Sequence, residues 1–430
     1  MDPRSVCKDR DSASRLLSAA VRLARATHAF FRRGEARWRL GSTRAAAFVG
    51  AAILEVAANP APCVGAQAPN PIPRRLGSSL EVLSGFDRIH QVRELPDGQL
   101  LVTSRRSDTP LLVDLRAGTS RAVARAGDGP GEFRQPSALL ALKDDSTLVV
   151  DLRRWVILHG SRPVVTVQAW LAGAYPPAIS GIDEYGRVLE IKPATYGAQA
   201  GTRVTPTVRN ATSLLVLLHH RAPTNSGNAV SGVIDTLARV AGAFRGIRRH
   251  TRSRVNGPAV TYELAQELAG DDQALLFQDG WVAIVYASPY RVEWYAPDGR
   301  RAAEALLPFE KVAVDAFQKR AFIARSWPQD PTLFSPNDFP PWPDVLPPFL
   351  PGALLPAPDG RLVILRTPDG RRPGTMYDLI DRRGILTARL LLEENERLAG
   401  FGSNAVYVVS RGEDDVESIK RHPWPPNSLE

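Results

Sequence analysis

Cysteine is scarce in this 430-residue chain, which holds only Cys7 and Cys63. The seven histidines show no His-x-x-x-His spacing and the two cysteines no Cys-x-x-Cys spacing, so the sequence has no local zinc motif. A Gly-x-Ser-x-Gly elbow is also missing, which removes support for a serine hydrolase of that kind. The local signatures of these enzyme classes are therefore absent from the sequence.

A large charge excess is also missing from most of the chain. The formal net charge is +9, but residues 1–68 hold eleven Lys and Arg against five Asp and Glu, a net of +6. The rest carries only +3 and has no long basic run. Phosphate backbones are bound by dense basic surfaces, so we expect no nucleic-acid partner. With 44% hydrophobic and 23% charged residues, a packed core is feasible.

An apolar run that could comfortably span a bilayer is lacking, but residues 37–68 have the layout of a secretory signal. Arg37, Arg39 and Arg44 precede the apolar run Ala45–Ala58, and Ala66–Ala68 (Ala-Gln-Ala) fits a cleavage site. Glu55 lies inside the apolar run and makes spanning less favourable. The pattern therefore predicts export with removal of the signal.

This interpretation divides the N-terminal region into a leader over residues 1–68 and a linker over residues 69–75. We expect a secreted or periplasmic mature chain with no cysteine and no transmembrane anchor. Two alternatives stay open: a translation start near residue 37, and a short amphipathic helix with no cleaved signal at all.

From about residue 76 the sequence alternates short β-rich runs with Asp-Gly turns, the pattern of β-hairpins. The runs group into units of four strands in roughly 35 residues, close to the size of a propeller blade. The first unit has runs at Ile89–Leu95, Leu100–Ser104, Leu111–Asp114 and Arg121–Ala124, and five more begin at Ser137, Ile179, Ala274, Ala353 and Arg397. We predict an all-β fold, a six-bladed β-propeller over residues 76–424, with a tail over 425–430.

The sixth unit is one strand short, because it holds only Arg397–Phe401, Ala405–Arg411 and Val416–Arg421. Ser79–Leu83 precedes the first unit and can supply the missing strand. Propellers that close in this way protect sheet edges that would otherwise pair with other chains. We therefore expect an N-terminal strand to close the ring.

Two insertions interrupt the repeat. Residues 241–272 begin polar and basic, and we expect a loop over one face of the propeller. Residues 312–351 begin with apolar residues at helical spacing, which predicts a short helix. The residues that share this helical face are Val314, Phe317, Ala321 and Phe322.

The second insertion ends in a proline-aromatic tract that contains Phe339, Trp342 and Phe349. We predict a candidate partner-binding loop here, either a polyproline ligand or a lid over the channel mouth. The alternative is that these side chains pack on the propeller, because exposed aromatics at this density are unfavourable in a soluble monomer.

The segment Gly127–Phe133 (Gly-Asp-Gly-Pro-Gly-Glu-Phe) is rich in glycine without being a phosphate loop. A P-loop ends in Gly-Lys-Ser/Thr between a strand and a helix, and Pro130 and Phe133 break that pattern. We instead predict a structural inter-blade loop with tight turns at its glycines and two side chains packed in the blade seam. The residues assigned to this loop are Gly127, Gly129, Gly131, Phe133 and Pro136.

The stretch Gly127–Pro136 resembles the inter-blade phrase of NHL-like six-bladed β-propellers, which are mostly uncharacterised bacterial secreted proteins. Similar phrases occur at Val233–Ala238, Tyr290–Gly299 and Gly400–Val409. The resemblance covers roughly residues 76–424. It implies the fold, but it implies no activity, because function belongs to sites rather than to folds.

Aspartates recur at the expected turns. Asp97, Asp279, Asp298 and Asp359 each precede a glycine, and we interpret them as turn residues rather than as catalytic acids. Three others end strands and are expected to cap turns through hydrogen bonds to the backbone, with the lining of one ring face as the alternative. These three are Asp114, Asp151 and Asp381.

Two functions follow from this reading. The first is an exported binding or scaffold protein whose propeller face, roofed by the insertions, holds an envelope protein, peptide or glycan. The second is a metal-dependent, lactonase-like hydrolase or lyase with its site in the central channel. Its possible ligands are Glu94, Glu190, Glu293 and Asn404, while we expect His219 to be packed or exposed.

The sequence shows no cofactor motif and identifies no catalytic residue, and it leaves open whether a divalent metal ion binds in the channel. We expect a monomer.

Overall fold

The computed structural model describes residues 70–105, 107–151, 154–168, 179–193, 213–220, 234–242, 247–254, 257–265, 268–327 and 329–424. All described residues belong to the unit Val64–Glu430 of the chain. The predicted signal segment, its cleavage site and the tail over 425–430 lie outside the described residues. Among the helices described, none combines the length and the apolar character needed to cross a membrane.

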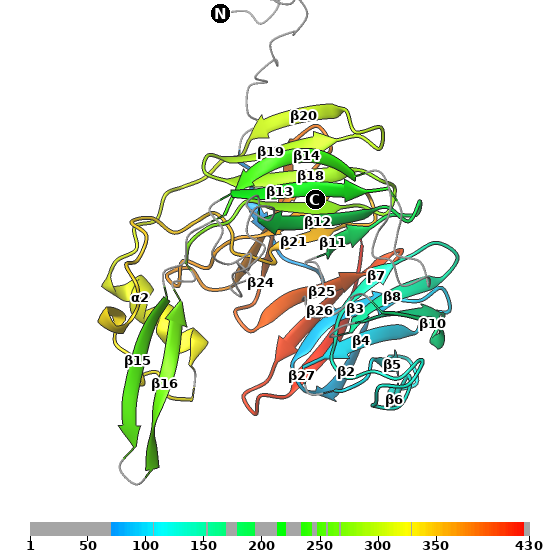
Figure 1. Ribbon diagram of the computed structural model, residues 1–430, viewed down its shortest axis with the longest axis horizontal. Coiled ribbons are helices and arrows are strands. Elements are labelled where there is room, and N and C mark those ends of the chain that lie inside the picture. The colour runs from blue at the N-terminus through cyan, green and yellow to red at the C-terminus, as the bar shows by residue number, and fades with distance from the viewer. Residues whose placement is uncertain are drawn as a thin grey trace, which may run out of the picture. The chain divides into compact units, whose positions relative to one another are not determined.

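Six antiparallel β-sheets form the blades of a β-propeller, which confirms the predicted six-bladed fold (Figure 1). The first three blades are β3 (Ile89–Glu94), β4 (Leu100–Ser104), β5 (Leu111–Asp114) and β6 (Thr119–Ala122); β7 (Pro136–Ala141), β8 (Ser146–Asp151), β9 (Arg154–His159) and β10 (Arg162–Gln168); and β11 (Ile179–Ile182), β12 (Val188–Pro193), β13 (Ser213–His219) and β14 (Ile234–Ala241).

The other three blades follow the same order from the inner to the outer strand. They are β17 (Gln273–Leu276), β18 (Val282–Ala287), β19 (Tyr290–Tyr295) and β20 (Arg301–Leu306); β21 (Leu354–Pro356), β22 (Leu362–Leu365), β23 (Thr375–Ile380) and β24 (Leu386–Leu392); and β25 (Glu396–Phe401), β26 (Ala405–Arg411), β27 (Glu417–Pro423) and β2 (Glu81–Phe86).

The N-terminal part of the described chain joins two blades. β2 pairs antiparallel with β27, from Glu81 opposite Arg421 to Phe86 opposite Glu417, and is the outer strand of blade 6. The sequence places this strand two to three residues earlier, at Ser79–Leu83. β1 (Pro73–Arg74) pairs in parallel with β24 and adds a fifth strand to blade 5. The segment between β1 and β2 therefore crosses from blade 5 to blade 6.

The seams between blades are apolar, because alternate residues of each strand face opposite neighbours. Each of the six seams has its own cluster of buried side chains. Leu100 and Val102 of β4 face blade 6, for example, whereas Leu101 between them faces blade 2. The blade 2–3 seam is the smallest, with Leu148 and Trp155 as its buried members.

The antiparallel order of the strands divides the connections between the two ends of the ring. The turns from first to second strand and from third to fourth strand lie at one end, which we call the turn face. The loops from second to third strand and the links between blades lie at the other end, which we call the connection face. Both insertions are links between blades, so both leave from the connection face.

The first insertion contains a β-hairpin, so the prediction of a loop over residues 241–272 is wrong. β15 (Ile247–Arg254) and β16 (Gly257–Ala265) pair antiparallel as a separate two-stranded sheet. In the second insertion, the predicted helix is present as α2 (Ala316–Ser326), followed by the 3-10 turn η3 (Pro336–Asp338). The Asp315 carboxylate caps α2 by accepting from the Gln318 N–H at 3.0 Å.

The two insertions share one hydrophobic core that is separate from the blade seams. Its buried members are Leu264, Leu268, Val314, Phe322, Ile323, Phe334, Phe339 and Leu346. We call β15, β16, α2, η3 and the tract up to Leu350 the insertion module. Figure 1 shows its hairpin and α2 lying side by side, on one side of the blades.

Candidate functional site

The predicted inter-blade loop is part of the structural framework. The Phe133 side chain is fully buried in the blade 1–2 seam, and Pro136 is the buried first residue of β7. Gly131 has φ of 76°, a conformation that side chains with a Cβ rarely adopt. A Cβ at Gly127 or Gly129 would collide with the end of the Glu132 side chain, which would have to move.

A buried ion pair holds this loop. The Asp151 carboxylate, 1% exposed, accepts from the backbone N–H groups of Arg134 and Gln135 at 3.0 and 2.5 Å. It also accepts from Arg154 Nε at 2.8 Å. The Arg154 guanidinium donates in turn to the carbonyls of Gly127 and Gly129. Asp151 therefore caps the loop through the backbone, as predicted for the aspartates at strand ends.

Most of the predicted turn aspartates on the turn face accept hydrogen bonds from the backbone of their own turns. Asp97, Asp298 and Asp359 each accept from the backbone N–H two residues ahead, at 3.0 to 3.1 Å. Asp114 and Asp381 cap their turns in the same way. Asp279 instead pairs with Arg382 of the next blade at 2.5 Å. These carboxylates are spread around the ring, and none of these contacts brings two of them together.

The four possible metal ligands belong to four different blades. Glu94 ends β3, Glu190 lies on β12, Glu293 lies on β19, and Asn404 lies in the exposed turn before β26. Glu190 Oε2 lies 2.8 Å from His219 Nε2, and His219 is packed, with 6% exposure. Within the described ranges, no three His, Cys, Asp or Glu side chains gather closely enough to hold a metal ion.

Glu293 is engaged by a polar network in the blade 3–4 seam. Its carboxylate accepts from the hydroxyls of Tyr286 and Tyr295, each at 3.0 Å, and pairs with Arg291. Burial opposes ionisation of Glu293, but these hydrogen bonds outweigh it and keep the pKa of the carboxyl below its usual value. Burial and the neighbouring carboxylate raise the pKa of Tyr295 to about 12. The network supports the seam rather than an open site.

The side-chain amides of two inner strands satisfy neighbouring backbone groups. Gln91 of β3 donates to the Leu139 carbonyl at 2.9 Å and accepts from the Leu139 N–H at 2.8 Å. Gln273 of β17 donates to the Leu350 carbonyl at 2.8 Å and accepts from the Gly352 N–H at 2.9 Å. Gln91 thus links β3 to β7 of the next blade, and Gln273 links β17 to the segment that precedes β21.

The aromatic tract of the second insertion is mostly buried. Phe349 is fully buried in the blade 4–5 seam, and Phe339 is 2% exposed in the core of the insertion module. Trp342 packs on Phe322 and Phe339, and its Nε1 donates to the Pro336 carbonyl at 2.9 Å. This burial favours the packing alternative for the candidate partner-binding loop Phe339, Trp342 and Phe349.

The hairpin of the insertion module has an inner and an outer face. On the inner face, Arg248 and Arg252 donate to the carbonyls of Asn337 and Leu333, and His250 packs edge-on against Phe334. On the outer face, Ile247 is 53% exposed and the Arg249 side chain is 76% exposed.

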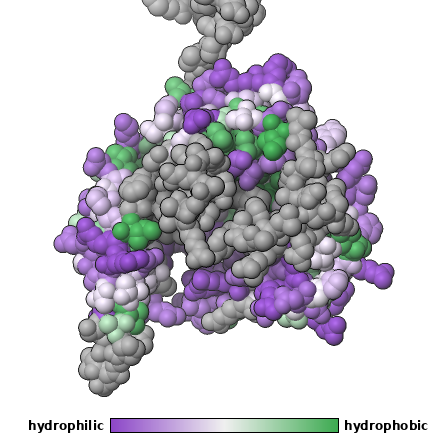
Figure 2. All heavy atoms as spheres, viewed as in Figure 1, coloured by the Kyte–Doolittle hydropathy of each residue, from purple (hydrophilic) through white to green (hydrophobic). Residues whose placement is uncertain are grey.

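Polar pairs cross the two strands on that outer face. Arg249 Nε lies 3.1 Å from Glu263 Oε1, and the hydroxyls of Thr251 and Thr261 are 3.0 Å apart. Figure 2 shows hydrophilic and hydrophobic side chains interspersed over the coloured part of this side of the molecule. The hairpin thus presents an open, polar strand surface on the connection face.

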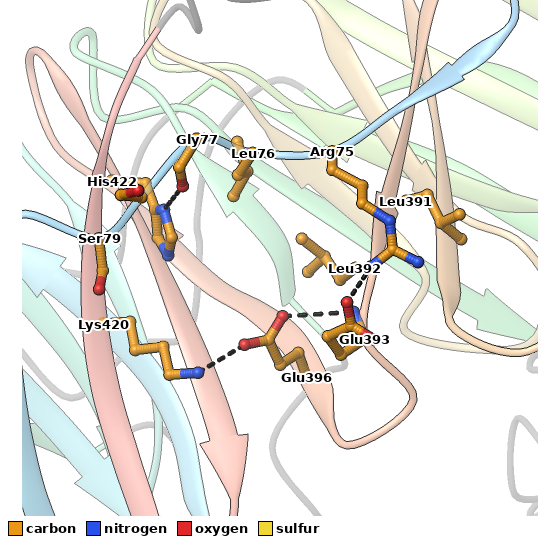
Figure 3. A pocket seen from close by; sticks show the side chains of 11 residues that line it. Arg75, Leu76, Gly77, Ser79, Leu391, Leu392, Glu393, Glu396, Lys420 and His422 are labelled. Carbon is orange, nitrogen blue, oxygen red and sulfur yellow. Dashed lines mark hydrogen bonds and ion pairs between the residues drawn. The ribbon is translucent and has the colours of Figure 1, made fainter.

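A second candidate site is a cleft between blades 5 and 6, with a volume of about 250 Å³ (Figure 3). We call it the blade 5–6 cleft. Its walls are the crossing segment 75–79, the end of β24, the start of β25, and β27. Two ion pairs line it, Arg75 with Glu393, and Lys420 Nζ with Glu396 Oε1 at 2.7 Å.

His422 is the buried titratable group of this cleft, with 8% exposure. Its Nδ1 lies 2.9 Å from the Gly77 carbonyl oxygen. Burial lowers the pKa of His422 below its ordinary value, against the opposing effects of the Gly77 carbonyl and Glu396. The imidazole is therefore mainly neutral near pH 7.

The sequence pointed to a binding face roofed by the insertions, but it predicted neither the hairpin nor the cleft. The hairpin had one available signal, the Asn-Gly dipeptide at 256–257, which is the usual turn signature of a tight hairpin. The cleft had none, because its walls come from residues more than 300 positions apart in the sequence that only the folded ring brings together.

Comparison with solved structures gives distant likenesses only. A gluconolactonase-like protein has 10% identity and a TM-score of 0.38, over 80% of this chain and 92% of that one. An inactive virginiamycin B lyase from Staphylococcus aureus has 10% identity and a TM-score of 0.36, over 80% of this chain and 99% of that one. The calcium-binding protein regucalcin from Agrobacterium tumefaciens has 11% identity and a TM-score of 0.33, over 80% of this chain and 94% of that one.

No protein-family model matches the chain, and no curated protein matches it. The likenesses to solved structures therefore say nothing about the activity of this chain. The six-bladed fold rests on the strand pairing described above.

Proposed function

We propose that this protein is an exported binding protein of the cell envelope, and that its insertion module holds an extended acidic segment of a partner protein. The hairpin β15–β16 is the contact element. The observation that carries the proposal is that the two insertions, separate in sequence, build a common core that fixes one face of this hairpin and leaves the other open.

The free edges of the hairpin support binding of an extended segment. Within the part of the chain that the structure describes, neither outer edge of this two-stranded sheet pairs with another strand. Unpaired strand edges carry rows of backbone N–H and C=O groups that a further strand can use. Peptides bind many domains by adding a strand to such an edge.

The charge of the hairpin supports an acidic partner. Residues 247–265 contain four arginines and one glutamate, a net of +3. Arg248 and Arg252 of this set lie on the inner face, where they donate to backbone carbonyls. Arg249 points to the open face, and its carboxylate partner Glu263 is itself 57% exposed. An exposed pair of this kind is weak and can exchange partners. Acidic side chains of a bound strand would find donors there.

Export is the second part of the proposal, and it rests on the signal-like residues 37–68. We expect N-terminal sequencing of the secreted or periplasmic protein to begin at Pro69, directly after Ala-Gln-Ala. Cytosolic recovery of the chain with residues 1–68 intact contradicts export by this signal. The NHL-like resemblance stays a hypothesis that fits this location.

Charge reversal at Arg249 tests the binding site. We expect the Arg249→Glu variant to bind a labelled peptide of alternating Glu and Val at least about tenfold more weakly than the unchanged protein, because one close charge is inverted. Fluorescence anisotropy measures the binding, and we expect affinity to fall as salt rises.

Arg300→Glu is the matched control. Arg300 is also exposed, at 73%, and also faces a carboxylate, Asp298, but it lies on the turn face. We expect this variant to bind the peptide as the unchanged protein does. Equal weakening by both variants would show a general charge effect and would remove the hairpin from the proposal.

A further inference from the structure

The blade 5–6 cleft is lined by apolar and polar surface in about equal parts. Leu76, Leu391 and Leu392 supply the apolar surface, and Glu396, Lys420 and His422 are among the polar groups. Placed polar groups of this kind fix the orientation of a small molecule in its site. The volume of about 250 Å³ is below the range of roughly 300–1,000 Å³ for drug-sized ligands, so the cleft fits a single-ring molecule.

The charges that line the cleft are balanced. Arg75 pairs with Glu393, and Lys420 with Glu396, so the two cations and two carboxylates cancel. The Glu393 N–H also donates to Glu396 Oε2 at 3.3 Å. A site for an anion or a cation would leave one sign of charge unmatched, and the pairing therefore favours an uncharged ligand.

His422 presents an open acceptor. The Gly77 carbonyl can only accept, so the hydrogen bond at 2.9 Å places the ring proton on Nδ1. The other nitrogen, Nε2, then carries a lone pair, and Figure 3 shows it on the side of the ring toward Lys420, away from Gly77. His422 is 8% exposed, and the hydrogen bond described for its ring is the one between Nδ1 and Gly77.

The Lys420 ammonium supplies hydrogen-bond donors near His422 Nε2. The Lys420 ammonium has three N–H groups, of which Glu396 takes one. Lys420 and His422 are two residues apart on β27 and therefore project from the same face of the strand. A hydroxyl group both donates and accepts, so neighbouring hydroxyls of one molecule can use His422 Nε2 and Lys420 Nζ together.

We propose that the blade 5–6 cleft binds a small, uncharged, polyhydroxylated molecule of the size of one sugar residue. His422 Nε2 accepts from one hydroxyl, Lys420 donates to the next, and the leucine side chains pack against the C–H face of the ring. This site is independent of the peptide surface on the insertion module.

The test uses the full chain and three probes: methyl α-glucoside, methyl α-mannoside and N-acetylglucosamine. Saturation-transfer NMR detects binding, and titration gives the affinity. The His422→Asn variant retains a donor for the Gly77 carbonyl but removes the Nε2 acceptor. We expect it to weaken binding of a sugar that the unchanged protein binds by about tenfold or more.

A second variant and a control complete the test. Ser79→Trp fills the cleft without altering His422 or Lys420, and we expect it to abolish sugar binding. His159→Asn makes the same substitution at an exposed histidine on β9, and we expect no change. Thermal unfolding checks that each variant is folded.

Two results overturn this proposal. One is that none of the three sugars binds up to tens of millimolar, or that only glucuronate or inorganic phosphate does. The other is that a sugar binds all variants equally. The acidic peptide is expected to bind the His422→Asn variant normally, so a failure of the cleft and a failure of the hairpin are separate results.

Discussion

Replacement of Asp151 by alanine is expected to lower the free energy of unfolding by about 3–5 kcal/mol, because it leaves a buried charge without its partner. Arg154 is 6% exposed and would keep its guanidinium in the blade 1–2 region with no carboxylate. The N–H groups of Arg134 and Gln135 would also lose their acceptor. Urea unfolding followed by tryptophan fluorescence measures the change.

Two comparisons make this prediction specific. Asp97→Ala removes an exposed turn aspartate with one backbone contact, and we expect a loss below about 1 kcal/mol. The double variant Asp151→Leu/Arg154→Met is expected to be more stable than Asp151→Ala, because no unpaired charge remains. An Asp151→Ala protein as stable as the Asp97→Ala protein contradicts the structural role of this pair.

Removal of the first two strands is expected to lower the free energy of unfolding by at least as much as the Asp151→Ala substitution does. A chain that begins at Asp87 lacks β1 and β2, and so exposes the whole edge of β27 and loses Phe86 and Leu83 from the blade 6–1 seam. The loss of these apolar contacts alone costs about 3–5 kcal/mol. We expect the truncated chain to unfold at lower temperature, with a broader transition, and to aggregate through the free edge.

The control for this truncation is a chain that begins at Pro69, which retains both strands. We expect it to unfold as the full chain does, because residues 1–68 are predicted to be a removable leader. Calorimetry of the two chains measures the difference. Equal transition midpoints for the Asp87 and Pro69 chains would show that β2 does not hold the ring together.

The blades could be predicted from the sequence because their signals are local. Asp-Gly turns and β-branched runs identify each strand within a few residues, as at β4 (Leu100–Ser104), where prediction and structure agree. The aspartate roles were equally local, since Asp97 and Asp359 bond to backbone two residues away. Such features need no knowledge of the rest of the fold.

The hairpin was missed because only one of its two strands alternates apolar with polar residues. On β15 the inner face carries Arg248 and Arg252, which donate to the carbonyls of Asn337 and Leu333. A search for period-two hydrophobicity therefore finds no strand in β15, although Tyr262 and Leu264 of β16 pack in the core of the insertion module. The helix was found because Phe322 follows the usual apolar spacing, although Phe317 remains 42% exposed.

The cleft lay beyond sequence reasoning for a different reason. Gly77, Glu396 and His422 meet only because the crossing segment runs from blade 5 to blade 6. The aromatic tract shows the reverse case, in which a conspicuous sequence feature proves to be mostly core: Phe349 fills a blade seam. Exposure, which decides between these roles, is a property of the closed ring.

Hydrogen exchange with and without the acidic peptide tests the central claim most directly, because it reports which backbone groups the bound segment covers. Within the described residues no strand pairs with the outer edges of β15 and β16, so a strand added there should slow the exchange of their amide N–H groups. The account predicts protection concentrated in residues 247–265 and unchanged exchange across the blades. Protection on the turn face, or none anywhere at saturating peptide, would contradict it.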